Sequence, residues 1–81
     1  MFAVYILQNR LTNRYYIGST DNIDRRLSEH NRGQTKSTRY AKKNWILVYK
    51  EEYCSRNEAH KRELKIKSFK GGDAFKRLLR V

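Results

Sequence analysis

The sequence predicts an α+β fold, in which a small three-stranded antiparallel sheet is flanked by helices. Three observations predict it. The chain has 81 residues, which is enough for one domain with a small core, so we expect a single domain over residues 1–81. Short segments rich in β-branched and aromatic residues indicate strands. Longer segments between helix-capping residues and glycines indicate helices, and together these give the order β-β-α-β-α-α.

The first two strands are predicted to form a hairpin. Phe2–Leu7 is short, aromatic and β-branched, as is typical of a buried strand. Turn-forming residues follow in Gln8–Arg14, and Tyr15–Gly18 reads as the second strand. Because the connection is so short and polar, the strands should be antiparallel. Gly18 is expected to end the second strand, since glycine permits a positive φ or a close backbone approach.

The first helix is predicted over Asn22–Asn31. Its apolar face is the i, i+4 pair Ile23 and Leu27, and Gly33 lies just beyond its end. Four consecutive residues could each cap its N-terminus, namely Ser19, Thr20, Asp21 and Asn22.

A basic segment with no acidic residue covers positions 31–43. Its basic residues are Arg32, Lys36, Arg39, Lys42 and Lys43. It reads either as a solvated loop or as an arm that contacts a polyanion, and the pattern leaves both interpretations open.

Trp45–Tyr49 is the strongest predicted strand, and it is too apolar for an edge strand with both faces in water. A capping box follows, in which Ser55 and Glu58 would satisfy each other's free backbone N–H groups. The helix after it should run to Phe69 or Lys70 and end at Gly71-Gly72. His60 is expected to face the solvent on this basic helix.

A last short helix is predicted to begin at Asp73, which would act as its cap. Phe75, Leu78 and Leu79 would form its apolar stripe, because they are spaced i, i+3, i+4.

The composition restricts the partners. Lys and Arg exceed Asp and Glu by 19 to 8, a formal net charge of +11 that favours a polyanion and above all nucleic acid. No apolar run is long enough to cross a bilayer and no leader-like segment opens the chain, so we expect no membrane partner. A single cysteine excludes an internal disulfide framework and a cysteine-based zinc site, and fits a reducing, cytoplasmic location.

Two helices carry ionisable side chains close to their apolar faces. Glu63 lies on or beside the stripe that contains Ala59 and Ile66, and Arg26 and His30 adjoin the apolar pair of the first helix. Unpartnered charges in such places cost several kcal/mol each. Either Arg26 and Glu63 pair with each other, or they belong to a shallow polar site. In that site Glu63 would hold a metal ion and Arg26 an anion.

Two tyrosines fall on the predicted hairpin. Tyr5 and Tyr16 lie on its two strands, and so short a hairpin can bring both hydroxyl groups to one face. Two strand tyrosines alone are usually packing residues, but these two accompany Arg26, His30 and Glu63.

This set of residues resembles the GIY-YIG nuclease domain. Tyr16-Ile17-Gly18 matches the second signature of that family, while Ala3-Val4-Tyr5 keeps only the tyrosine of the first. Arg26, His30 and Glu63 follow in register, and the resemblance covers about residues 2–70. The chain is most similar to the small, standalone members of the family.

The resemblance implies hydrolysis of phosphodiester bonds with one divalent cation, Mg²⁺ or Mn²⁺. Tyr5 would be the general base or would orient the attacking water, and Tyr16 would help to position that water or the phosphate. Arg26 would clamp the scissile phosphate, His30 would assist, and Glu63 would be the single protein ligand of the metal. A further polar residue that some members carry after the metal-binding helix has no counterpart in Lys67–Val81.

The resulting hypothesis is a metal-dependent DNA endonuclease in DNA repair or processing. It would recognise nucleic-acid structure or backbone, since nothing in the sequence reads bases, and a protein partner could supply specificity. The basic residues expected to contact nucleic acid are Arg25, Arg32, Lys36, Arg39, Lys42, Lys43 and Lys67. The alternative is a catalytically weak or inactive DNA- or RNA-binding module of the same fold. A basic RNA-binding or ribosome-associated protein of unrelated fold rests on composition alone.

Overall fold

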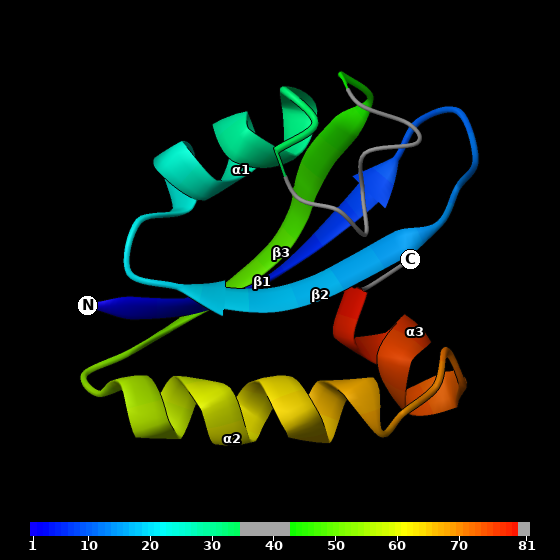
Figure 1. Cartoon of the computed structure of the whole chain (residues 1–81). Helices are drawn as coiled ribbons and strands as arrows, with labels where there is room; N and C mark the ends of the chain where they lie inside the picture. Colours follow the sequence, from blue (N-terminus) through cyan, green and yellow to red (C-terminus); the bar gives the residue numbers. More distant parts are fainter. Residues whose placement is uncertain (35–42, 80–81) are drawn as a thin grey trace.

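The structure of the protein is a computed structural model, which describes residues 1–34 and 43–79. It confirms the α+β class and the order β-β-α-β-α-α (Figure 1). The elements are β1 (Phe2–Asn9), β2 (Tyr15–Thr20), α1 (Ile23–Asn31), β3 (Trp45–Tyr53), α2 (Arg56–Lys67) and α3 (Asp73–Leu79). Among the residues described, no helix is long and apolar enough to cross a lipid bilayer.

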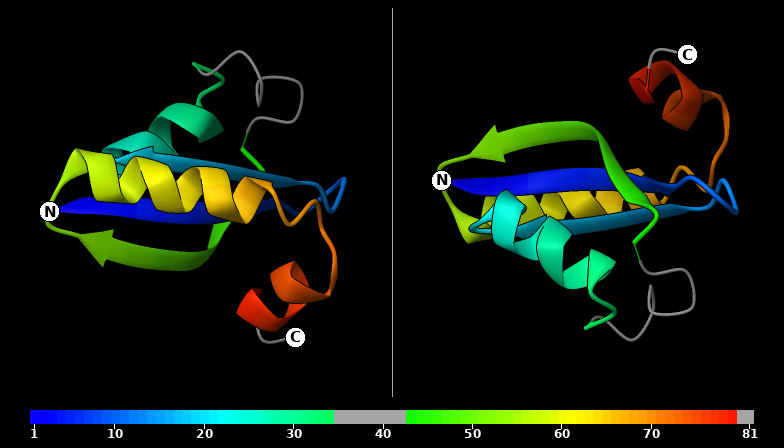
Figure 2. Two further views of the ribbon diagram at one scale, coloured as in Figure 1. Left: turned by 90° about the horizontal axis from the view of Figure 1, so that it is seen from below. Right: turned by 90° about the horizontal axis from the view of Figure 1, so that it is seen from above.

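The sheet is antiparallel, with strand order β2-β1-β3, so β1 is the central strand. Helix α1 covers one face, and α2 and α3 cover the other (Figures 1 and 2). Because successive side chains of a strand point to opposite faces, β1 contributes to both layers. Val4 and Ile6 pack with Ala59, Ile66 and Phe75 below the sheet. The residues packed on the other face are Tyr5, Leu7 and Trp45, joined by Tyr16, Ile23 and Leu27.

The strand β1 continues two residues past the predicted end at Leu7, and the predicted turn is correspondingly shorter. Asn9 makes this extension stable. Its backbone still pairs with Trp45 of β3, while its buried side-chain amide accepts hydrogen bonds from the backbone N–H groups of Leu11 and Thr12. One residue therefore ends the strand and caps the turn, which a count of apolar residues does not reveal.

Gly18 does not end β2, so that prediction was wrong. The strand continues to Thr20, and Gly18 pairs with Tyr5 in the middle of the ladder. Its φ is not positive; the glycines of the described chain with positive φ are Gly33 and Gly71. The reason for glycine at this position is the space needed by the ring of Tyr5, described below.

The predicted capping residues of α1 and α2 are confirmed, α1 ends at the predicted Asn31, and Asp73 is the first residue of α3 rather than its cap. Asn22 caps α1, and its side chain accepts from the N–H of Arg25. Ser55 caps α2, because its hydroxyl oxygen accepts a hydrogen bond from the backbone N–H of Glu58. The carboxylate of Glu58 accepts from the hydroxyl of Ser55, whereas the predicted capping box has it accept from the backbone N–H of Ser55. Helix α2 ends at Lys67, short of the predicted Phe69 or Lys70.

The early end of α2 has a local cause. The hydroxyl of Ser68 donates to the carbonyl of Lys65 at 2.5 Å, and the N–H groups of residues 68–70 close tight i to i+3 turns. Lys70 already adopts a positive φ of 51°, ahead of the predicted stop at Gly71. Phe75 is buried and Leu78 and Leu79 pack beside it, as the spacing in α3 predicted.

The strand β3 is an edge strand and extends beyond the predicted Tyr49 to Tyr53. Its faces are partly covered, because Trp45 packs on the α1 side and Val48 and Tyr49 pack on the other. The added segment contains Glu51, which accepts hydrogen bonds from the hydroxyls of Tyr49 and Tyr53. Arg62 of α2 also contacts both oxygens of Glu51, at 2.9 and 3.0 Å, and so fastens α2 to β3.

We expect Glu51→Gln to flatten the acid dependence of stability. Burial raises the pKa of Glu51, but the hydrogen bonds from Arg62, Tyr49 and Tyr53 outweigh it and lower this pKa to about 2, from 4.5. The unfolded chain therefore binds more protons than the folded chain between these pH values. The contribution of Glu51 to the stability of the fold is complete above pH ~4.5 and is lost as the pH falls towards ~2. The variant should lose about 1–3 kcal/mol at neutral pH.

Urea unfolding of the two proteins between pH 2 and 7 measures this effect. Glu52→Gln is the control, because Glu52 lies on the same strand but is half exposed and contacts only Lys50, at 3.6 Å, among the ion pairs of the described chain. Parallel acid profiles for wild type and Glu51→Gln would contradict the role of this network.

Candidate active site

Tyr5 stands at the centre of the sheet face that α1 covers. Its ring lies over Gly18, its register partner, so closely that a Cβ atom there would be 2.6 Å from the Tyr5 hydroxyl and 2.8 Å from its Cζ. Tyr16 lies two residues earlier on β2 and shares this face, with ring centroids 6.2 Å apart. The hairpin therefore brings the two phenol rings together.

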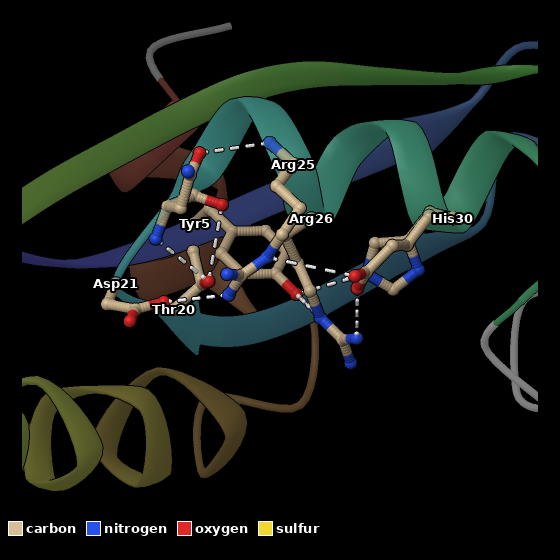
Figure 3. A network of polar contacts seen from close by, with 8 residues as sticks. Tyr5, Thr20, Asp21, Arg25, Arg26 and His30 are labelled. Carbon is tan, nitrogen blue, oxygen red and sulfur yellow. Dashed lines mark hydrogen bonds and ion pairs between the residues drawn. The ribbon is translucent and has the colours of Figure 1, made fainter.

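Helix α1 adds two groups to the Tyr5 hydroxyl. Nε2 of His30 lies 3.0 Å from the hydroxyl oxygen, and Nε of Arg26 donates to that oxygen at 3.3 Å (Figure 3). The guanidinium of Arg26 also contacts Glu29 at 3.0 Å, and the ring of His30 packs against Tyr16 at 4.6 Å. Four of the predicted site residues, Tyr5, Tyr16, Arg26 and His30, thus form one cluster.

The protonation states of this cluster follow from its burial. Burial raises the pKa of Tyr5 to about 12, although the hydrogen bond from Arg26 works in the opposite direction. Burial and then the charge of Arg26 lower the pKa of His30 to about 4. At neutral pH both groups are therefore uncharged. Since Arg26 donates to the phenol oxygen, the phenol proton can be donated to Nε2 of a neutral His30.

Glu63 approaches from the other face of the sheet. Ser19 follows Gly18 on β2, and its side chain points towards α2, where its hydroxyl donates to Oε1 of Glu63 at 2.7 Å. Nζ of Lys67 contacts Oε2 at 2.7 Å. Burial works to raise the pKa of Glu63, but the hydrogen bonds from Lys67 and Ser19 outweigh it, so this pKa is lowered and the carboxylate is ionised at neutral pH.

The two halves of the site meet at β2. Glu63 and the Tyr5 cluster lie on opposite faces of this edge strand, at the adjacent residues Ser19 and Gly18. The carboxylate is near enough for its charge to contribute to the raised pKa of Tyr5. Tyr5 and His30 are buried, and the Arg26 side chain, which is 31% exposed, is the part of their hydrogen-bonded group that reaches the surface. The edge strand β2 therefore has an ionised carboxylate on one face and the guanidinium of Arg26, beside the two tyrosines, on the other.

The predicted alternative, a structural pair between Arg26 and Glu63, does not match the contacts. Arg26 forms its ion pair with Glu29, three residues further along α1. Glu63 interacts with Lys67, His60 and Ser19. Each charge is therefore balanced on its own face of the sheet.

A comparison with protein families matches residues 1–72 to the GIY-YIG catalytic domain. The chain belongs to the GIY-YIG family. This is a family of nucleases.

Three relatives are UPF0213 proteins. The one from Staphylococcus haemolyticus is 36% identical over 66 residues, which cover 82% of this chain and 79% of the relative. The one from Desulfotalea psychrophila is 44% identical, over 79% of this chain and 58% of the relative. The one from Staphylococcus aureus is 37% identical over 54 residues, 67% of this chain and 66% of the relative. No solved structure matches the chain.

The basic residues that were predicted to contact nucleic acid differ in their surroundings. Arg32 and Lys43 are exposed, and Arg25 is exposed but ion-paired with Asp21 at 2.8 Å. Lys67 contacts Glu63. The other three, Lys36, Arg39 and Lys42, lie outside the described residues. Nucleic-acid contact by these residues stays a prediction.

Glu63 is the group in this GIY-YIG site that suits a divalent cation. Mg²⁺ is commonly held by one carboxylate together with waters and phosphate oxygens. Over residues 1–34 and 43–79, no three His, Cys, Asp or Glu side chains gather into a metal-binding group. The fit therefore depends on the ionised carboxylate of Glu63 and on the groups beside it.

Sequence reasoning missed three residues that position the site. Ser19 was considered only as a helix cap, whereas its side chain anchors Glu63. Glu29 holds the guanidinium of Arg26, a role indicated by its i+3 spacing on the helix. Gly18 was expected to end the strand through a positive φ or a close backbone approach, whereas the register of the hairpin shows that it makes room for the Tyr5 ring.

We expect Gly18→Ala to displace the Tyr5 ring from β2 and to lower the stability of the protein by about 1–3 kcal/mol. The added Cβ atom would lie within 3 Å of two atoms of that ring. Urea unfolding measures the loss of stability, and near-ultraviolet circular dichroism reports the displaced tyrosine. Gly72→Ala is the control, because its new Cβ atom would meet only the carbonyl oxygen of Phe69, at 3.3 Å. Equal losses in the two variants would argue against a special role of Gly18.

Proposed function

We propose that this chain is a metal-dependent endonuclease that hydrolyses phosphodiester bonds in DNA. The observation that carries the proposal is the gathering of Tyr5, Arg26 and His30 at Gly18, with Glu63 anchored at the next residue of β2. The net charge of +11 supports a polyanionic substrate. These groups recognise phosphate rather than bases, which favours recognition of DNA structure or backbone during repair or processing.

Arg26 is the phosphate-binding group of this mechanism. A guanidinium has five N–H donors, and the contacts with Tyr5 and Glu29 engage Nε and Nη1. The side chain is 31% exposed, so its outer edge can reach a phosphate at the surface. Two parallel N–H bonds to the phosphate oxygens would hold the scissile group and stabilise the charge that develops there.

Tyr5 and His30 provide a route for the proton of the attacking water. As the phenol oxygen accepts this proton, its own proton would pass to Nε2 of His30, 3.0 Å away. The charge of Arg26 is one cause of the low pKa of His30. A phosphate bound to Arg26 would offset this charge, so His30 would become a better proton acceptor when substrate is present.

Glu63 would hold Mg²⁺ or Mn²⁺ in this mechanism. The bound cation would supply positive charge to the phosphate and the leaving oxygen. Ser19 keeps the carboxylate at β2, and Lys67 helps to keep it ionised, as the lowered pKa shows. Cytoplasmic location and a protein partner that supplies specificity stay predictions.

We expect Glu63→Gln and Arg26→Ala each to reduce the nicking of supercoiled DNA by at least about 100-fold, as is typical when a group that stabilises transition-state charge is removed. The assay uses Mg²⁺ or Mn²⁺ and follows conversion of supercoiled to nicked plasmid. Glu52→Gln and Arg77→Ala are the charge-matched controls, because both residues are exposed and lie outside the site.

Unchanged nicking in the two site variants would refute the assigned site. The alternative, a binding module of the same fold, predicts another outcome. In that case the purified wild-type protein would bind DNA or RNA with an affinity that falls steeply with salt, but would show no metal-dependent cleavage.

We expect kcat/KM to be almost independent of pH between 5 and 8 and to fall below about pH 4–5. His30 accepts the phenol proton only when it is neutral, and its pKa is lowered to about 4. If the reaction instead required the Tyr5 phenolate, the rate would rise about tenfold per pH unit over this range, because the pKa of Tyr5 is about 12. A plasmid-nicking pH profile separates these two outcomes.

A further inference from the structure

The two oxygens of the Glu63 carboxylate have different neighbours. Oε2 contacts the ammonium group of Lys67 at 2.7 Å. Oε1 accepts from Ser19 and lies 3.8 Å from Nδ1 of His60, one turn earlier on α2. The carboxylate therefore presents one oxygen to a fixed positive charge and the other to an imidazole nitrogen and a hydroxyl.

The distance between Glu63 and His60 suits two ligands of one ion. Neighbouring ligands of an octahedral ion with bonds of about 2.1 Å are about 3 Å apart. The His60 side chain is 58% exposed, so a rotation about its own bonds can close the difference from 3.8 Å. Helix residues spaced i, i+3 lie on the same face, so both side chains can reach one ion.

We propose that His60 is a second protein ligand of the cation, beside Glu63, and that it makes this site prefer Mn²⁺ to Mg²⁺. The inference rests on the proposed function, because it takes Glu63 as a metal ligand. Imidazole nitrogen is a good ligand for transition-metal ions, whereas Mg²⁺ favours oxygen and keeps most of its waters. His60 therefore acts on the choice of metal rather than on the phosphate.

The chain offers a simple spectroscopic test, because it contains only two histidines and the other, His30, is buried on the opposite face of the sheet. Mn²⁺ is added to the protein without DNA at pH 8, because a ligating imidazole must be neutral. Electron spin echo envelope modulation then detects ¹⁴N coupling from an imidazole bound to Mn²⁺. Continuous-wave spectra of free Mn²⁺ give the affinity, and competition gives the affinity for Mg²⁺.

We expect imidazole coupling in the wild type and none in His60→Ala. The variant should bind Mn²⁺ at least about tenfold more weakly, with a much smaller change for Mg²⁺. Asn57→Ala is the matched control, since Asn57 is a neutral, exposed residue one turn before His60 on the same helix. It should keep both the coupling and the affinity.

Glu63→Gln separates failure of this inference from failure of the proposed function. If Mn²⁺ binds the wild type, binds Glu63→Gln poorly and shows no imidazole coupling, then Glu63 is a ligand and the inference about His60 is overturned. Equal Mn²⁺ affinity for wild type and His60→Ala would overturn it in the same way. If Glu63→Gln binds Mn²⁺ as well as the wild type does, the proposed metal site and the inference both fail.

Discussion

The packing of the Tyr5 ring on the bare backbone of Gly18 is the contact on which the site depends. It holds the phenol against β2, so that the hydroxyl lies within 3.0 Å of His30 and 3.3 Å of Arg26. Any side chain at position 18 would occupy the volume of the ring. The same close packing buries Tyr5 and keeps it a neutral phenol, which suits a group that passes on a proton better than one that must carry a charge.

The alternation of side chains along β2 divides the ionisable groups into two sets. Gly18 lies against Tyr5, whose hydroxyl contacts His30, whereas Ser19 holds the ionised carboxylate of Glu63. Had Arg26 reached Glu63, the two charges would have neutralised each other. Because the sheet lies between them, Arg26 pairs with Glu29 on one face and Glu63 pairs with Lys67 on the other.

The features that the sequence predicted correctly are those that depend on residues close together in the chain. Element order and the caps Asn22 and Ser55 follow from neighbouring residues, and the clustering of two tyrosines with Arg26 and His30 follows from periodicity and the family resemblance. The length of β2 and the contact between Gly18 and Tyr5 depend on the register between β1 and β2, which cannot be read from a single sequence. Helical periodicity placed Glu63 beside an apolar stripe but could not say which sheet face that stripe covers.

A chain with a net charge of +11 presents an electrostatic difficulty for any cation site, because its field repels divalent ions. In the proposed mechanism, the substrate resolves this difficulty. A bound polyanion neutralises the basic surface, and its phosphate oxygens can complete the metal coordination that Glu63 begins. Since coupling between two binding equilibria is reciprocal, the metal then strengthens the binding of the phosphate by the same factor. In this mechanism the protein without DNA binds the cation more weakly than the complex with DNA does.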